Sequence, residues 1–165
     1  MCCSQVQEHI STGDSTGRLI EYDPKTKQGR VLLSGLKGAG GVGVSKDGSF
    51  VLVSEFKGSR ITKYWLSGPK ADTAELLLKI SGPANMKRTE RGDFWVALNI
   101  QLKHLNTTKN RPTGVRMDEN GNILEIVPFE GKPYDGSYIT EVHELVQGKL
   151  YVASIYVSFG GICTI

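Results

Sequence analysis

The adjacent residues His143 and Glu144 form the pair in this sequence that most resembles a general base with an orienting carboxylate. Such a pair works only when both side chains reach the same substrate. Because the surrounding residues have the pattern of a β-strand, in which neighbours point to opposite faces, we predict that His143 is solvated or hydrogen-bonded instead. His9 and His104 lie in segments without a clear pattern. The sequence contains no nucleophile elbow, phosphate-binding glycine loop or cluster of histidines and cysteines.

The three cysteines, Cys2, Cys3 and Cys163, lack the spacing of metal ligands. Adjacent cysteines join each other only with strain. We therefore predict three unpaired thiols and no cofactor held by them.

Composition and charge exclude several classes of partner. The chain has 165 residues, and 20 Lys and Arg against 17 Asp and Glu give a net charge of +3. The basic residues are scattered, so we expect no nucleic-acid partner. No apolar run approaches the roughly 20 residues that span a bilayer, and the first residues lack the apolar core of a signal peptide. We expect a small-molecule substrate or ligand as the partner.

The pattern of the chain predicts an all-β fold. Twenty glycines, six prolines and short apolar runs separated by turn residues favour antiparallel strands. Two kinds of hairpin alternate in strict order. Apolar hairpins are expected at 40–56, 85–98 and 139–156, and more polar hairpins at 17–36, 60–80 and 113–129. This alternation is typical of four-stranded propeller blades, each with an apolar inner and a polar outer hairpin; a two-sheet sandwich is the alternative.

The turn glycines Gly48, Gly92 and Gly148 recur at intervals that suit one blade each. Tight hairpins need glycine because its backbone adopts positive φ without steric cost. The longer interval contains a polar segment, 100–112, which we expect to be a loop. The chain then holds two full blades and parts of two others, just over three in all, whereas propellers close at about four to eight.

Several segments resemble the strictosidine synthase family of plants. They are RITKYWLSGPK at 60–70, TAELLLKI at 73–80, GPANMKR at 82–88 and GDFWVALN at 92–99. KYWL followed by GPK is the most specific element, and the other segments would fit many propellers, including regucalcin-like and paraoxonase-like lactonases and esterases. The resemblance implies a six-bladed β-propeller of the kind known for condensing an amine with an aldehyde in alkaloid synthesis.

The resemblance also places these blades in the second half of the ring. We therefore expect residues 1–165 to be the C-terminal part of a propeller domain, with the first blades and any signal peptide upstream of Met1. An unclosed row of blades leaves strand edges and blade faces uncovered. We expect the 165-residue chain by itself to self-associate, aggregate or be partly unfolded.

Catalysis in the family that this chain resembles depends on one glutamate in the inner strand of the last blade. The spacing of Ile139 and Val142 matches the two apolar positions of that strand, and it puts Thr140 in the place of the glutamate. Counting back from Gly148 instead puts Glu141 there. A shift by one residue turns a side chain to the opposite face, so only one of the two alignments is right. We favour Thr140, whose hydroxyl cannot act as the general base.

Two further residues are candidates for ligand binding. Asn85 occupies the position where related propeller hydrolases place an amide on a central calcium ion. The preceding blade reads Gly40-Gly41 where those relatives have Asn-Gly, so we favour a structural hydrogen bond from Asn85 over metal binding. Glu55, at the end of an inner strand, either faces the mouth of the channel or is an exposed strand-end carboxylate.

Two tryptophans and one sequon complete the set of residues with a predicted role. We expect Trp65 and Trp95 to pack within or between blades and not to line a ligand site. Asn106 begins the triplet Asn-Thr-Thr, a glycosylation acceptor in chains that enter the secretory route. Together with the resemblance to vacuolar proteins, it predicts a secretory or vacuolar glycoprotein.

Three classes of function follow from these observations. The first is a carbon–nitrogen lyase of the strictosidine synthase type, against which the absent glutamate argues. The second is a hydrolase of esters or lactones, which a calcium-dependent activity would distinguish. The third is a noncatalytic propeller that binds a small apolar molecule or a protein. We expect a strictosidine-synthase-like propeller without the catalytic glutamate, with the hydrolase as the next alternative.

Overall fold

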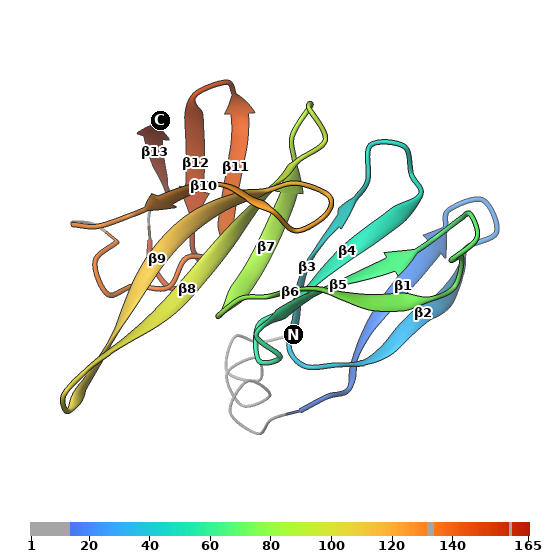
Figure 1. Cartoon of the computed structure of the whole chain (residues 1–165), viewed down its shortest axis with the longest axis horizontal. Coiled ribbons are helices and arrows are strands. Elements are labelled where there is room, and N and C mark those ends of the chain that lie inside the picture. Colours follow the sequence, from blue (N-terminus) through green and yellow to red (C-terminus); the bar gives the residue numbers. More distant parts are fainter. Residues whose placement is uncertain (1–13, 132–133, 159) are drawn as a thin grey trace.

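The computed structural model describes residues 14–131, 134–158 and 160–165, and all regular secondary structure within them is β-strand. Thirteen strands follow one another along the chain (Figure 1). They are β1 (Gly17–Asp23), β2 (Gln28–Leu36), β3 (Ala39–Val44), β4 (Phe50–Glu55), β5 (Arg60–Trp65), β6 (Ala74–Lys79), β7 (Pro83–Arg88), β8 (Phe94–His104), β9 (Thr107–Met117), β10 (Ile123–Pro128), β11 (Glu141–Val146), β12 (Lys149–Ala153) and β13 (Gly161–Thr164).

The strands form four antiparallel sheets in which each strand pairs with the next one along the chain. β1–β2 is the first sheet, β3–β4–β5–β6 the second, β7–β8–β9–β10 the third and β11–β12–β13 the fourth. In Figure 1 the first three sheets follow one another from right to left and the fourth lies above the third, and the inner strands β3, β7 and β11 contact one another in turn. This succession of meanders confirms the propeller architecture, with two full blades and two partial ones, and excludes a sandwich of two sheets.

The turns of the apolar hairpins have the predicted geometry. Gly48, Gly92 and Gly148 have φ values of 73°, 111° and 77°. A side chain at these positions would be strained, which is why the turns recur as glycine in the sequence. The tight turns predicted at these three glycines, one in each apolar hairpin, are therefore confirmed.

Apolar side chains fill the spaces between successive sheets. Residues 94–99 of β8 are buried on both faces, with Phe94 and Val96 directed to the second sheet and Trp95 to the fourth. The predicted packing role of Trp95 is confirmed, and Trp65 is partly buried against Phe50 with ring centroids 5.6 Å apart. A third cluster joins the β1–β2 sheet to the second sheet. Each blade is thus held by its neighbours and not by a core of its own.

The segment 100–112 is not a loop, which corrects the prediction. β8 and β9 pair without interruption from Phe94 opposite Met117 to His104 opposite Thr107. The outer half of this hairpin projects beyond its sheet (Figure 1), so its side chains are mostly exposed and lack the alternation that marks a blade strand. Backbone hydrogen bonds form such a ladder without any apolar pattern.

Among the described residues, no helix is long and apolar enough to cross a membrane. Cys163 is a free thiol, as predicted. Cys2, Cys3 and His9 lie outside the described residues, and their predictions stay untested.

Candidate functional site

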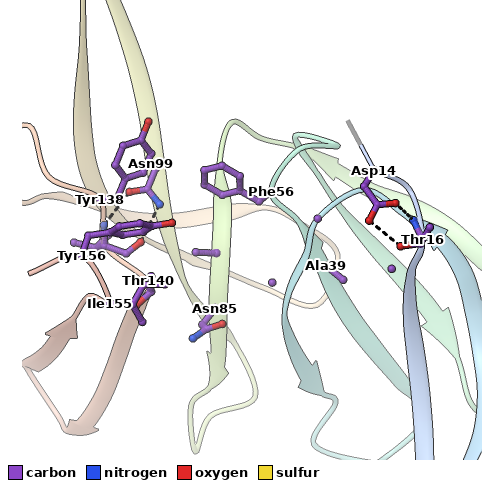
Figure 2. Close-up of a pocket in the computed structure, with 15 residues that line it drawn as sticks. Asp14, Thr16, Ala39, Phe56, Asn85, Asn99, Tyr138, Thr140, Ile155 and Tyr156 are labelled. Atoms are coloured by element: carbon purple, nitrogen blue, oxygen red, sulfur yellow. Dashed lines mark hydrogen bonds between the residues drawn. The ribbon is translucent and has the colours of Figure 1, made fainter. Parts of the chain in front are cut away.

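A cavity of about 610 Å³ lies where the four sheets meet, at the ends of the inner strands (Figure 2). Most of its lining is apolar, as is usual for small-molecule sites. The lining comes from the first three sheets and from loops, including those before β11 and after β12: Asp14, Thr16, Gly17, Gly38, Ala39, Gly40, Phe56, Ala84, Asn85, Asn99, Tyr138, Ile139, Thr140, Ile155 and Tyr156.

Three aromatic rings form one wall of the cavity. The Tyr138 ring lies between the other two, with its centroid 6.4 Å from that of Phe56 and 5.6 Å from that of Tyr156. The ring planes are tilted to one another by 49° and 54°, an ordinary packing geometry for aromatic side chains. This wall offers ring faces and edges to a flat apolar ligand, and the sequence analysis missed it because each ring comes from a different loop.

Asn99 fixes the segment that carries Tyr138 and Thr140. Its side-chain amide donates a hydrogen bond to the carbonyl oxygen of Ile139 and accepts one from the backbone N–H of the same residue, each at 2.9 Å. Asn99 is 2% exposed, and the Ile139 side chain is buried in the space between the third and fourth sheets. Two bonds to one residue fix both its position along the strand and its rotation.

Two more amides extend this contact along the β8–β9 hairpin. Asn110 donates to the side-chain oxygen of Asn99 at 3.2 Å and also to the carbonyl oxygen of Ser137. Gln101, paired with Asn110 across the hairpin, donates to the Asn110 side chain at 2.8 Å and to the Tyr138 hydroxyl at 3.2 Å. The three amides, which we call the amide ladder (Asn99, Asn110 and Gln101), hold the aromatic wall against the hairpin.

Thr140 lies beside the cavity as a result of this arrangement (Figure 2). Its backbone N–H donates to the Ala153 carbonyl at 2.9 Å, and its carbonyl oxygen accepts from the Asn85 N–H at 3.1 Å. Its hydroxyl donates to the same Ala153 carbonyl at 3.4 Å. The residue at the cavity wall is therefore a neutral hydroxyl, already satisfied by the backbone.

Glu141 is not among the residues that line the cavity. Its Oε2 atom accepts a hydrogen bond from the Asn85 side chain at 3.2 Å and lies 3.6 Å from the Lys87 Nζ atom. The other carboxylate oxygen is buried without a hydrogen-bond partner among the described residues. Glu141 lines instead a second, shallower hollow of about 360 Å³ on the outward face of the fourth sheet, together with His143.

Glu55 is neither at the channel mouth nor exposed, which corrects both expectations for it. The residue is 0% exposed, and its two oxygens accept hydrogen bonds from the Arg60 guanidinium at 2.6 and 3.0 Å, from the Thr62 hydroxyl at 2.8 Å and from the Lys37 N–H at 2.9 Å. Burial opposes ionisation, but these hydrogen bonds outweigh it and hold the pKa of Glu55 below its ordinary value. The carboxylate is a structural group that fixes the turn after β4.

The residues near Asn85 do not fit a calcium ion. Calcium takes six to eight oxygen ligands from carboxylates, carbonyl groups and water. Asn85 directs its NH₂ group to Glu141, and the Lys87 ammonium is paired with that same carboxylate. Gly40, where those relatives have the asparagine, has no side chain to offer. At Gly41 a Cβ atom would lie 2.6 Å from the Asn85 Cα atom, so the close approach of β3 and β7 leaves no room for a side chain there. The hydrogen bond from Asn85 agrees with its structural interpretation.

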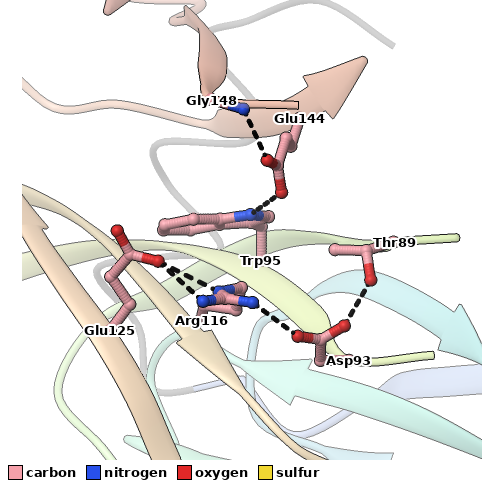
Figure 3. Close-up of polar contacts among 7 residues, drawn as sticks. All are labelled: Thr89, Asp93, Trp95, Arg116, Glu125, Glu144 and Gly148. Atoms are coloured by element: carbon pink, nitrogen blue, oxygen red, sulfur yellow. Dashed lines mark hydrogen bonds and ion pairs between the residues drawn. The ribbon is translucent and has the colours of Figure 1, made fainter. Parts of the chain in front are cut away.

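His143 and Glu144 point to opposite faces of β11, as predicted. Glu144 accepts hydrogen bonds from the Trp95 ring N–H and from the Gly148 N–H, both at 3.0 Å (Figure 3). Burial disfavours the charged form, yet these two donors outweigh it and lower the pKa of Glu144. The carboxylate joins the third and fourth sheets and takes no part in the cavity.

Arg116 completes this contact between sheets. Its guanidinium lies over the Trp95 ring, 5.9 Å from the centroid, and forms ion pairs with Asp93 and Glu125, each at 2.9 Å (Figure 3). The Trp95 ring therefore has a guanidinium cation over its face and donates a hydrogen bond from its N–H edge to Glu144. This cluster accounts for the burial of Trp95 without any role in ligand binding.

The sequence of this chain is similar to those of strictosidine synthase and related plant proteins. A family model for strictosidine synthase matches residues 3–69. Strictosidine synthase of Catharanthus roseus is 43% identical over 157 residues, which are 95% of this chain and 44% of that protein. Protein STRICTOSIDINE SYNTHASE-LIKE 12 of Arabidopsis thaliana is 40% identical over 163 residues, 96% of this chain and 47% of that protein. The chain spans about half the length of the curated relatives it matches.

Solved structures give the same fold at much lower identity. A luciferin-regenerating enzyme aligns with a TM-score of 0.66 at 17% identity, over 90% of this chain and 51% of its own. A gluconolactonase from Xanthomonas campestris aligns with a TM-score of 0.62 at 15% identity, over 83% of this chain and 41% of its own. These likenesses show the propeller fold alone. From the sequence relatives and the blades together, the chain belongs to the strictosidine synthase family.

Proposed function

We propose that the cavity binds a small, largely apolar molecule with an aromatic ring, and that the protein does not carry out the amine–aldehyde condensation that the family resemblance implies. One observation supports this most directly. Thr140 lies at the cavity wall, while the neighbouring carboxylate of Glu141 is turned away and paired with Asn85 and Lys87. A general base must reach the proton that it removes, and a threonine hydroxyl is not basic enough for that task.

The lining also suggests how a ligand is oriented. The aromatic wall of Tyr138 and Tyr156 lies at one end of the cavity, and Asp14 with Thr16 lies at the other (Figure 2). Asp14 is the one charged side chain among the lining residues that the structure describes, and its carboxylate accepts hydrogen bonds from the Thr16 N–H and hydroxyl at 2.8 Å. We expect a ring at the tyrosine end and a neutral or cationic polar group at the Asp14 end.

A hydrolase of esters or lactones is the weaker alternative. It depends on a central calcium ion, which the contacts of Asn85 and Glu141 do not favour. Hydrolysis of phenyl acetate or of a simple lactone by the purified protein, dependent on added calcium, would support this alternative and overturn the proposal.

The test is a chimera, because this chain spans about half of its relatives. Residues 14–165 replace the matching segment of the Catharanthus roseus enzyme, and the product is assayed with tryptamine and secologanin. We expect no strictosidine above background, since loss of a positioned base removes about 10²- to 10⁴-fold in rate. Thr140→Glu in the chimera should restore product, and Glu141→Gln, the matched control, should change nothing.

Binding is measured separately, by calorimetric titration of tryptamine into the same chimera. We expect binding that Tyr138→Ala weakens by about tenfold or more, because the central ring of the aromatic wall is removed. Robust product from the unaltered chimera that is lost in Glu141→Gln would show that Glu141 is the base and that the placement of Thr140 is wrong. Absence of tryptamine binding in a folded chimera would contradict the ligand class.

A further inference from the structure

The side-chain amide of Asn85 has a fixed orientation because its partner is a carboxylate. Its NH₂ group donates to the Glu141 Oε2 atom at 3.2 Å, and the Lys87 ammonium lies 3.6 Å from the same oxygen. A carboxylate only accepts hydrogen bonds, whereas an amide has a donor side and an acceptor side. The alternative orientation would place the Asn85 Oδ1 atom against Glu141, where two acceptors oppose each other. The NH₂ group is therefore held toward Glu141 and the Oδ1 atom away from it.

The Oδ1 atom of Asn85 is open to the cavity. Asn85 lines the cavity and does not line the second hollow. In Figure 2 it lies between Thr140 and Ala39, and its oxygen is on the side away from Thr140. Within the described part of the chain no donor bonds Oδ1, and the buried side-chain atoms without a partner there are Arg111 Nε and Glu141 Oε1. The Asn85 Oδ1 atom is therefore accessible, and it can accept a hydrogen bond from a ligand.

Thr140 adds a second acceptor next to Asn85. The backbone N–H of Asn85 donates to the carbonyl oxygen of Thr140 at 3.1 Å, so the two residues are direct neighbours in the cavity wall. A hydroxyl has one proton to donate, and that of Thr140 is directed to the Ala153 carbonyl oxygen at 3.4 Å. Its oxygen is left to accept. This part of the wall thus offers two neutral acceptors side by side.

Many donors of the cavity wall are already used within the protein. Backbone N–H groups with an acceptor in the described part of the chain belong to these lining residues: Phe56, Asn85, Asn99, Ile139, Thr140 and Tyr156. A ligand acceptor that finds no donor loses the hydrogen bond that it made with water, whereas a ligand donor finds Asn85. The wall therefore favours a ligand that donates over one that accepts.

The charges around Asn85 favour a neutral donor. Lys87 already pairs with Glu141, so a cationic group beside Asn85 has no uncompensated negative charge to meet. A metal ion would need six to eight oxygen ligands, of which Asn85 supplies one. A neutral N–H or O–H group needs only one acceptor, and moving it from water into an apolar cavity costs far less than moving a charge.

We propose that Asn85 determines which ligands this cavity accepts, because its Oδ1 atom bonds a neutral N–H or O–H donor carried by the ring of the ligand. The ring packs on the aromatic wall of Tyr138 and Tyr156 while its donor reaches Asn85. Glu141 is a positioning residue that holds the Asn85 amide in the accepting orientation. This inference rests on the proposed function, since it names which aromatic molecules the same cavity takes.

The test compares two probes that differ by one donor. Tryptamine has a ring N–H, and its benzofuran analogue, 2-(benzofuran-3-yl)ethylamine, has an oxygen atom in that place with the same side chain and nearly the same shape. Calorimetric titration into the chimera of the proposed function gives the ratio of the two affinities. Asn85→Leu keeps the volume but removes the acceptor, so it should lower the preference for tryptamine about three- to tenfold, the worth of one neutral hydrogen bond. Its circular dichroism spectrum should be unchanged.

A second variant tests the orientation of the amide separately from stability. Glu141→Leu leaves no carboxylate to hold the NH₂ group, so the preference for tryptamine should fall by a similar factor while both probes still bind. Arg88→Gln, the matched control, removes a charge from the same strand as Asn85, and the preference should stay.

Each outcome has a distinct meaning. A preference that survives Asn85→Leu overturns the inference and leaves the proposed function standing. One that survives Glu141→Leu alone overturns the positioning role of Glu141. Failure of both probes to bind a folded chimera overturns the proposed function and this inference with it.

Discussion

The side-chain amide of Asn99 bonds both the N–H and the carbonyl oxygen of Ile139, each at 2.9 Å. Ile139 is thereby held with its side chain in the core, and the next residue, Thr140, lines the cavity. Glu141, the first residue of β11, does not line this cavity and lines the second hollow instead. We expect this contact, between residues 40 apart in the chain, to decide which of the two neighbouring residues faces a ligand.

Loss of the contact between Asn99 and Ile139 should destabilise the fold and let the segment before β11 change its register. Asn99→Ala leaves the two buried backbone groups of Ile139 without this partner and removes one of the hydrogen bonds of the Asn110 amide, so we expect about 2–4 kcal/mol less stability in urea unfolding. Gln101→Ala, at the exposed end of the amide ladder, should cost about 1 kcal/mol or less.

A labelling measurement distinguishes a change of register from simple destabilisation. In a background without native cysteines, we place a cysteine at position 140 or 141 and measure its rate of modification by a thiol reagent with and without Asn99→Ala. The ratio of the modification rate at position 140 to that at position 141 should change when Asn99 is replaced. An unchanged ratio, with stability reduced, would mean that Asn99 supports the strand without setting its register.

The contact between Glu144 and the Trp95 ring should make stability depend on pH. The pKa of Glu144 is lowered in the folded protein from its ordinary value of 4.5, so the stabilisation is present above that value and is lost as the pH falls through the lower folded value. Glu144→Gln should cost about 1 kcal/mol at pH 7, and the difference from the native protein should shrink toward pH 3. Glu90→Gln, at an exposed position, should show no such trend; a constant difference for Glu144→Gln would contradict the assignment.

Calcium should bind weakly or not at all. The Lys87 ammonium already pairs with Glu141, and Asn85 offers its NH₂ group to that carboxylate. Isothermal titration should give a dissociation constant on the order of 10⁻³ M or weaker, and Lys87→Gln is the variant most able to strengthen it. Micromolar binding that disappears in Asn85→Ala would refute the structural interpretation of Asn85.

The sequon at Asn106 lies in the turn between β8 and β9, at the exposed tip of the projecting hairpin. We propose that it carries a glycan and that the protein follows the secretory route to the vacuole. Protein from plant cells that express the unmodified gene should run lighter after glycosidase treatment. Asn106→Gln and Thr108→Ala should abolish the shift, whereas Thr107→Ala, the matched control, should keep it. No shift in the native protein would count against a secretory history.

Local patterns in the sequence were enough to predict the blades. Turn glycines such as Gly48 need positive φ, and inner strands such as the one that holds Trp95 need apolar residues on both faces. Both requirements act within a single hairpin, so the sequence shows the same pattern of turn glycines and apolar strands in each blade. The family could be recognised for the same reason, because its motifs are short and contiguous.

Contacts between residues distant in the chain determined the burial of Glu55, the 100–112 hairpin and the lining of the cavity. Glu55 is buried because Arg60 and the Lys37 N–H enclose it, and the 100–112 segment is a hairpin because its backbone pairs with itself without an apolar pattern. The lining of the cavity comes from three sheets and from loops next to the fourth, and the amide that bonds Ile139, beside Thr140, belongs to another blade. A sequence records the periodicity that each strand needs for burial, but the partner of a buried amide or carboxylate is chosen only when distant blades pack together, and no local period marks that choice.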